Sequence, residues 1–297
     1  GLSATTGTAV TGTPATTQTY SLSGTDANGC IGNTTTTITV NTLPAITVNS
    51  ASICIGQQTA TLTANGADTY TWNPTSDLSS GTGSLVTGTP SVTQTYTITG
   101  TDVNGCFNSN TTTITVNPLP TISANSATIC VGQQTATLTA TGANTYSWIP
   151  GTGLSATTGS LVTGTPTITQ QYTVAGMDIN GCINGTVTAI TVNPLPTVTV
   201  NSATICVGQQ TATLTANGAT TYSWIPGTGL SATTGSVVTG TPTITQQYTV
   251  AGMDTNGCIN GTVTAITVNP LPTLVTSPNT TVCPSSTNTL STAGANT

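Results

Sequence analysis

Eight cysteines are the residues of this chain whose type and spacing best suit covalent chemistry. Four of them recur at a spacing of 76 residues, and the other four keep that spacing to within one residue. The first set is Cys30, Cys106, Cys182 and Cys258, and the second set is Cys54, Cys130, Cys206 and Cys283. The chain has no histidine, the commonest zinc ligand. Thiols at strict repeat spacing therefore favour disulfides, formed outside the cell.

The rest of the composition removes most other chemistry. Among 297 residues there is no Lys, Arg, His or Glu, so the formal net charge of −6 comes from six Asp. Without cationic side chains the chain cannot neutralise phosphates, which excludes nucleic acids and anionic membrane surfaces as partners. General acid–base catalysis also lacks most of its usual groups. We expect no enzyme and no cofactor, and no apolar run is long enough for membrane insertion.

The chain is a tandem array of one module, which must position the cysteines. Trp72, Trp148 and Trp224 keep the spacing of 76, and residues 120–195 differ from 196–271 at only seven positions. We expect three complete modules and two partial ones: 1–43 (the C-terminal half of a module), 44–119, 120–195, 196–271 and 272–297 (an N-terminal part). The chain is then a segment of a longer array, or a subunit whose tail completes the head of the next subunit by strand addition.

The sequence of a module predicts an all-β fold, since in no stretch do apolar residues recur with the 3.6-residue period of a helix. The 80 threonines are β-branched and favour strands. In the third complete module we expect strands at 197–200, 211–216, 221–225, around 237–238, at 247–253 and at 262–268. About seven short strands, with a Trp on the third and a Tyr opening the sixth, predict immunoglobulin-like β-sandwich modules arranged end to end.

Several segments resemble a known repeat type. The run Ile205 to Ala216, the stretch Thr221 to Trp224, the stretch Tyr248 to Cys258 and the Val-Asn-Pro-Leu-Pro linker are similar to the Ig-like and PKD-like repeats of Bacteroidota surface proteins. The resemblance covers essentially the whole chain. It implies a cell-surface or gliding-type adhesin, or an extracellular fibre, exported by the type IX route.

The pairing of the cysteines follows from strand direction. In the expected sandwich Cys206 precedes the second strand and Cys258 follows the sixth, and these two strands run the same way. The two thiols would then be about 25 Å apart, for eight residues at roughly 3.3 Å each, whereas a disulfide needs Cα atoms within about 7 Å. A staggered scheme between neighbouring modules is favoured and predicts a stiff, mechanically continuous rod. Its pairs are Cys54–Cys182 and Cys130–Cys258.

Two alternatives to the staggered scheme stay open. The within-module scheme pairs Cys54–Cys106, Cys130–Cys182 and Cys206–Cys258. In the other alternative the thiols are free.

Two further motifs have a functional and a plain interpretation. The Asp-x-Asn-Gly repeats resemble the start of a calcium loop but lack its later ligands, so they favour a hairpin turn, with a weak calcium site involving Asp68 or Asp77 as the alternative. These repeats begin at Asp26, Asp102, Asp178 and Asp254. Asn-x-Ser/Thr sequons make Asn33, Asn110, Asn184, Asn260 and Asn279 candidate glycosylation sites.

Together these features predict a structural stalk of an extracellular bacterial surface fibre or adhesin. Its partners would be copies of itself or neighbouring repeats, and surface glycans. One alternative is an accessory carbohydrate-binding array on a secreted polysaccharide-degrading enzyme, with sugars stacked on exposed Trp. Another is an ice-binding adhesin extender, suggested by the Thr-x-Thr runs. The Trp residues lie mid-strand beside Tyr, which favours core positions.

Overall fold

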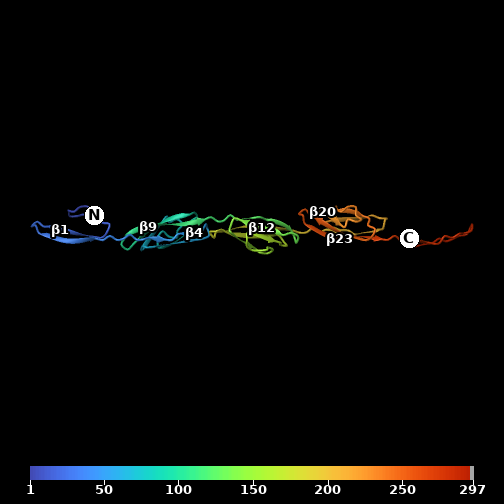
Figure 1. Cartoon of the computed structure of the whole chain (residues 1–297), viewed down its shortest axis with the longest axis horizontal. Coiled ribbons are helices and arrows are strands. Elements are labelled where there is room, and N and C mark those ends of the chain that lie inside the picture. The colour runs from blue at the N-terminus through green and yellow to red at the C-terminus, as the bar shows by residue number, and fades with distance from the viewer. Residues whose placement is uncertain (295–297) are drawn as a thin grey trace. The chain divides into compact units, whose positions relative to one another are not determined.

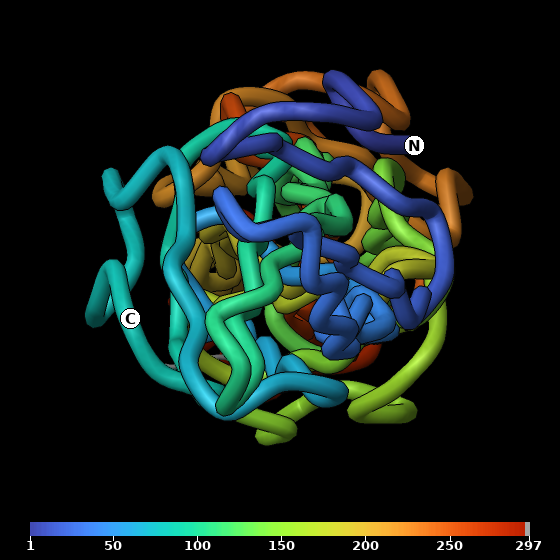
Figure 2. Tube along the Cα trace, turned by 90° about the vertical axis from the view of Figure 1, so that its left-hand side faces the viewer, coloured from blue at the N-terminus to red at the C-terminus, as the bar shows by residue number. Residues whose placement is uncertain are grey.

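The computed structural model describes residues 1–294, and every regular element in that range is a β-strand (Figure 1). Figure 2 traces the backbone of the same chain as a tube. The chain forms two compact units. Unit 1 comprises 1–121, 142–144 and 176–184, and unit 2 comprises 122–141, 145–175 and the part from 185 onward. We call residues 44–119, 120–195 and 196–271 the first, middle and last module.

Each of the three modules has the same seven strands. In the first module they are β3 (Thr47–Val48), β4 (Ala51–Cys54), β5 (Ala60–Asn65), β6 (Thr69–Asn73), β7 (Leu85–Gly88), β8 (Gln94–Thr101) and β9 (Phe107–Asn117). In the middle module they are β10 (Ser123–Ala124), β11 (Ala127–Cys130), β12 (Ala136–Thr141), β13 (Thr145–Ile149), β14 (Leu161–Gly164), β15 (Gln170–Met177) and β16 (Ile183–Asn193). In the last module they are β17 (Thr199–Val200), β18 (Ala203–Cys206), β19 (Ala212–Asn217), β20 (Thr221–Ile225), β21 (Val237–Gly240), β22 (Gln246–Met253) and β23 (Ile259–Asn269).

The seven strands of a module form two sheets packed as a sandwich. In the last module one sheet has the order β17-β19-β21 and the other β18-β23-β22-β20. All neighbours are antiparallel except β18, which runs parallel to β23 with Cys206 opposite Asn269. The first strand of the module is thus divided between the two sheets. This is an immunoglobulin-like arrangement, and the chain is a tandem array of such modules.

Most expected strands are present, with one addition and one shortening. The strand expected at 197–200 is reduced to β17, and β18 was not expected at all. A four-residue strand that pairs in parallel with the end of the last strand of its own module leaves little local signal in the sequence. Its consequence is large, because β18 places Cys206 at the end of β23 opposite to the hairpin cysteine, Cys258.

Alternating side chains from both sheets fill the core between them. In the last module Leu214, Trp224, Tyr248, Val250 and Ile266 are at most 1% exposed. The intervening residues of β19 and β20 point outward and are mostly threonine and serine, so hydroxyl groups rather than charges keep the surface hydrated. Unit 1 has the equivalent core around Leu62, Trp72 and Tyr96.

Beyond the three complete modules, the chain ends have fewer strands. At the N-terminus β1 (Gln18–Thr25) pairs with β2 (Ile31–Ile38) as an antiparallel hairpin. Toward the C-terminus β24 (Val275–Thr276) pairs with β25 (Thr292–Ala293). Leu22 of β1 and Leu290 before β25 are 60% and 78% exposed. These hairpins have no second sheet among the described residues to cover their apolar side chains.

One buried hydroxyl differs between the copies. The Tyr172 and Tyr248 hydroxyls donate hydrogen bonds to the carbonyls of Thr152 (3.0 Å) and Thr228 (2.9 Å). The equivalent Tyr96 is also fully buried, but its hydroxyl has no partner among the described residues. The loop that supplies the acceptor has Gly229 in the last module, whereas the first module has Asp77 there, at a φ of 65°. An unpartnered buried hydroxyl costs stability.

We predict that Tyr96→Phe leaves the free energy of unfolding unchanged or raises it, because the hydroxyl it removes has no partner. Tyr248→Phe removes a buried hydrogen bond and should lower the free energy of unfolding by about 1 kcal/mol. Urea unfolding followed by tryptophan fluorescence measures both, with Trp72 and Trp224 reporting the respective modules. An equal loss in the two variants would contradict the difference between the modules.

Ionisation of the same tyrosines should lower the stability of the folded protein at alkaline pH. Burial raises the pKa of Tyr96, Tyr172 and Tyr248 above 10.0, and the negative charge of Asp77 adds to this at Tyr96. A pKa that is higher in the folded state means stability that is fully present below about pH 10 and lost as the pH rises through the folded pKa. Urea unfolding at increasing pH should show the free energy falling only above about pH 10. A variant with all three tyrosines changed to Phe should show a smaller fall.

Candidate functional site: the junction between modules

Each junction begins with a cysteine at the end of a short parallel strand. Cys54 ends β4 opposite Asn117, the last residue of β9. A tight turn follows, in which the Gln57 backbone N–H donates to the Cys54 carbonyl (3.1 Å). The Cys54 N–H donates to Oε1 of Gln58 (3.1 Å). Cys130 with Gln133 and Gln134 repeats this arrangement in the middle module. The cysteine is therefore held at the end of the module from which the chain leaves.

The second half of the junction is the hairpin loop that follows β15 or β22. Oδ1 of Asp178 accepts hydrogen bonds from the backbone N–H groups of Asn180 (2.8 Å) and Cys182 (2.9 Å). Gly181 has a φ of +79°, in the left-handed region that glycine adopts without strain. The aspartate thus shapes the turn and orients the cysteine after it. Asp26, Asp102 and Asp254 form the same loop.

Two disulfides join these halves across neighbouring modules. Cys54 is bonded to Cys182, with Cα atoms 5.4 Å apart, and Cys130 to Cys258, with Cα atoms 5.5 Å apart. Each bond spans 128 residues of sequence, and all four cysteines are at most 2% exposed. The first bond lies within unit 1 and the second within unit 2. The structure therefore has the staggered pairs.

None of the within-module pairs forms. The pairs Cys54–Cys106, Cys130–Cys182 and Cys206–Cys258 would have to connect opposite ends of an 11-residue strand, such as β16 or β23. At roughly 3.3 Å per residue such a strand spans about 35 Å. Cys30, Cys106, Cys206 and Cys283 remain free thiols.

A glutamine side chain accompanies each disulfide. The Gln57 amide donates from Nε2 to the carbonyl of Ile183 (2.5 Å) and accepts at Oε1 from the Ile183 N–H (3.3 Å). Gln133 makes the same pair of hydrogen bonds to the backbone of Ile259. The side-chain amide thus takes the place of a peptide group and pairs with the residue next to the disulfide. Sequence reasoning missed these glutamines, although the Gln-Gln pair after each strand-end cysteine is visible in the printed chain.

An asparagine ties the linker to the module that it enters. Nδ2 of Asn184 donates to the carbonyl of Pro120, and Nδ2 of Asn260 to that of Pro196, both at 2.9 Å. Asn110 donates from Nδ2 to the carbonyl of Ile46 (2.9 Å). These three asparagines are candidate glycosylation sites, and each already donates a hydrogen bond from Nδ2, the atom to which a glycan would be attached. All five candidate asparagines, including Asn33 and Asn279, are exposed residues.

Charge plays little part in the junction. The carboxylate of Asp178 or Asp254 accepts backbone hydrogen bonds in its own turn. Within residues 1–294 no three residues among His, Cys, Asp and Glu lie close enough to hold a metal ion. Asp68 and Asp77, the residues considered for a calcium site, belong to other loops of the first module. The junction is therefore held by covalent and neutral polar bonds, which salt screens little.

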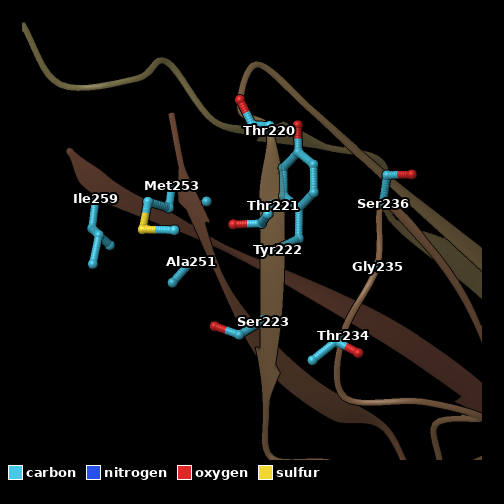
Figure 3. Close-up of a pocket in the computed structure, with 11 residues that line it drawn as sticks. Thr220, Thr221, Tyr222, Ser223, Thr234, Gly235, Ser236, Ala251, Met253 and Ile259 are labelled. Carbon is cyan, nitrogen blue, oxygen red and sulfur yellow. The ribbon is translucent and has the colours of Figure 1, made fainter. Parts of the chain in front are cut away.

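The tryptophans are core residues. Trp72, Trp148 and Trp224 are 3%, 1% and 1% exposed, and each indole Nε1 donates to a glycine carbonyl in the segment that pairs with the tryptophan's own strand. They offer no surface on which a sugar could stack. A shallow hollow of about 580 Å³ does lie at one end of the last module, and Figure 3 shows Ala251, Met253 and Ile259 on one side of β20. Among its lining residues the one aromatic side chain is Tyr222, which is 8% exposed.

No helix among the described residues is long and apolar enough to cross a membrane.

The comparisons with family models and with curated proteins found no match to this chain. Solved structures similar to parts of it include a Ca2+-stabilised adhesin with which an Antarctic bacterium reaches out and binds ice, at 16% identity over 86% of this chain and 82% of the other, with a TM-score of 0.39.

Two more structures illustrate the range of these matches. Three consecutive titin immunoglobulin domains match at 12% identity over 77% of this chain and 100% of the other, with a TM-score of 0.39. A 1.5-MDa bacterial ice-binding adhesin matches at 14% identity over 77% and 100%, with a TM-score of 0.32. At TM-scores below 0.5 these likenesses carry no argument about the function of the chain.

We predict that the disulfides stabilise the chain strongly and the free thiols do not. Closing a loop of 128 residues restricts the unfolded chain by about 5 kcal/mol in the chain-entropy model. Cys182→Ser should therefore lower the free energy of unfolding by up to that amount. The matched control is Cys106→Ser, at the same place in the neighbouring hairpin, which should change it by less than about 0.5 kcal/mol. Urea unfolding without reductant measures both, and equal effects would contradict the prediction.

Proposed function

We propose that the chain is a load-bearing spacer, the stalk of an extracellular surface fibre or adhesin, without catalytic activity. The observation that supports this proposal most directly is the double covalent connection at the two junctions between the complete modules. One connection is the peptide linker, and the other is a buried disulfide between modules. A chain whose modules only needed to be tethered would need the linker alone.

The two connections run side by side. At the first junction Cys54 is the register neighbour of Asn117, where the linker begins, and Asn184 binds the carbonyl of Pro120, where the linker ends. Cys182 lies two residues before Asn184. The disulfide and the linker therefore join the same two ends. The side chain of Gln57 or Gln133, bound to the backbone of the neighbouring module, adds a further contact that we call the glutamine clamp. Two parallel connections with this clamp leave a junction less freedom to bend or twist than one peptide segment does.

An extracellular location suits this chemistry. Disulfides persist in oxidising compartments and are rare in the cytosol. The resemblance to Bacteroidota surface repeats adds the type IX route as the means of export, and neighbouring repeats and surface glycans as partners. The hydroxyl-rich, nearly uncharged surface would keep such a stalk hydrated over a wide range of salt.

The carbohydrate-binding alternative has less support. It was founded on exposed tryptophans, and all three are buried. The hollow in Figure 3 presents methyl and thioether groups beside small hydroxyls, without an exposed aromatic face.

Single-molecule stretching tests the mechanical proposal. In the oxidised chain the disulfide keeps the Cα atoms of Cys54 and Cys182 within about 7 Å of each other even when their modules unfold. After reduction the 128 residues between them can extend to roughly 430 Å, at about 3.3–3.6 Å per residue. We expect the oxidised chain to extend far less than the reduced chain before it resists further pulling.

The control for this experiment is the variant with Cys54, Cys130, Cys182 and Cys258 all changed to Ser, pulled under oxidising conditions. It should extend as far as the reduced chain. Both bonds must be removed, because their loops overlap and either disulfide alone limits the extension equally. Equal extension of the oxidised and reduced chains would mean that the disulfides do not bear load, and would overturn the proposal.

A further inference from the structure

The four free thiols are of two complementary kinds. Cys206 occupies the strand-end position that Cys54 and Cys130 fill in bonded junctions, and Cys283 corresponds to that position in the sequence repeat. Cys30 and Cys106 occupy the hairpin position of Cys182 and Cys258. A partner 128 positions away in the required direction lies outside the 297 residues for each of the four. Each kind of free thiol therefore corresponds to one partner of the disulfides seen between modules, the strand-end cysteine or the hairpin cysteine.

The Cys206 half-site is built like the bonded ones. Cys206 ends β18, and its N–H donates to Oε1 of Gln210 (3.0 Å), as the N–H of Cys54 does to Gln58. The Gln209 backbone N–H donates to the Cys206 carbonyl (3.2 Å), which places Gln209 where Gln57 and Gln133 bind the next module. The Gln209 side chain is exposed, and within residues 1–294 no hydrogen bond is assigned to its amide.

The Cys106 half-site is likewise complete. Oδ1 of Asp102 accepts from the N–H groups of Asn104 (2.9 Å) and Cys106 (2.8 Å), which forms the same loop as in the bonded hairpins. Cys182 and Cys258 are fully buried, whereas Cys106 is half-buried. Phe107, which follows it, is 67% exposed. The thiol and the backbone that a glutamine would bind are both accessible.

We propose that Cys206 with Gln209 is an open binding site for the Asp-x-Asn-Gly-Cys hairpin of another copy of this module, and that Cys106 is the matching open hairpin. The partner module comes from a second chain or from further along the same polypeptide. This inference deepens the proposed function, on which it rests, because it names the partner of the same junction.

The bond forms by thiol–disulfide exchange. The Cys206 thiolate attacks glutathione disulfide and releases one glutathione, which leaves Cys206 in a mixed disulfide. The thiolate of the incoming hairpin cysteine then attacks the Cys206 sulfur and releases a second glutathione. The two cysteines are oxidised to one disulfide, glutathione disulfide is reduced to two glutathiones, and these carry the two protons.

The glutamine makes the site selective. The glutamine side chain hydrogen-bonds the backbone of the residue that follows the hairpin cysteine. A disulfide between two strand-end cysteines would lack these hydrogen bonds. Cys283 is followed by Pro284, Ser285 and Ser286, with Ser286 in the place of Gln209. Cys283 therefore lacks the clamp and should pair with less preference than Cys206.

The first test oxidises the full chain in a glutathione and glutathione disulfide buffer and maps the bonds by mass spectrometry of peptic peptides without reduction. Pepsin suits a chain that has no site for trypsin, and its acidic pH suppresses exchange. We expect bonds from Cys206 to Cys30 or Cys106 of a second chain, and few bonds between Cys206 residues. Gln209→Ala should reduce the cross-kind bonds about fivefold, from the loss of two neutral hydrogen bonds. Gln247→Ala, at an exposed position on β22, is the matched control.

The second test lengthens the full chain by one more copy of residues 196–271, inserted after residue 271. We expect Cys206 to bond to the hairpin cysteine of the added copy. Cross-kind bonds in the first test identify a second chain as a competent partner, and their appearance only in the second test identifies the same polypeptide. A free Cys206, or pairing without regard to kind, in both tests overturns the proposal. Neither of these two tests involves force. A negative result for the open binding site can therefore be told apart from a negative result for the load-bearing stalk.

Discussion

The length of the last strand in each module governs how the chain is cross-linked. β16 and β23 have 11 residues, with a hairpin cysteine immediately before the strand and a strand-end cysteine paired with its last residue. A cysteine at one end of a module cannot reach the cysteine at the other end, but it lies next to the adjoining end of its neighbour. Inter-module disulfides and the glutamine clamp follow from this separation.

The junction shows how a chain without cations or histidine can build a specific contact. Ion pairs are unavailable, so every element of the contact is covalent or neutral: a disulfide, an amide that pairs like a peptide group, and an asparagine bound to a linker carbonyl. Asp178 acts through local backbone hydrogen bonds and not through a distant charge. Such bonds depend on geometry more than on ionic strength, and repeating modules reproduce the geometry.

Near-identical copies also reveal what small departures do. Asp77 stands in the first module where the other modules have Gly153 and Gly229, and the Tyr96 hydroxyl in the same module has no partner. The equivalent hydroxyls of Tyr172 and Tyr248 are bonded. The outer sheet face differs too. Thr99, Thr101 and Thr111 lie there in the first module, whereas the last module has Ala251, Met253 and Val263 at the equivalent positions. The two disulfide-bonded junctions are nevertheless alike.

The sequence alone determined the all-β class, the 76-residue period and the core positions of Trp and Tyr, because alternation and repetition are local and visible in one dimension. It also favoured the staggered disulfides, since strand direction can be counted along the chain. Only the tertiary structure decided that Ala203–Cys206 is a strand, that Gln57 and Gln133 bind the neighbouring module, and that Asn184 holds Pro120. Each of these depends on a partner more than sixty residues away or on a parallel pairing, and no local pattern encodes which distant backbone group a side-chain amide will meet.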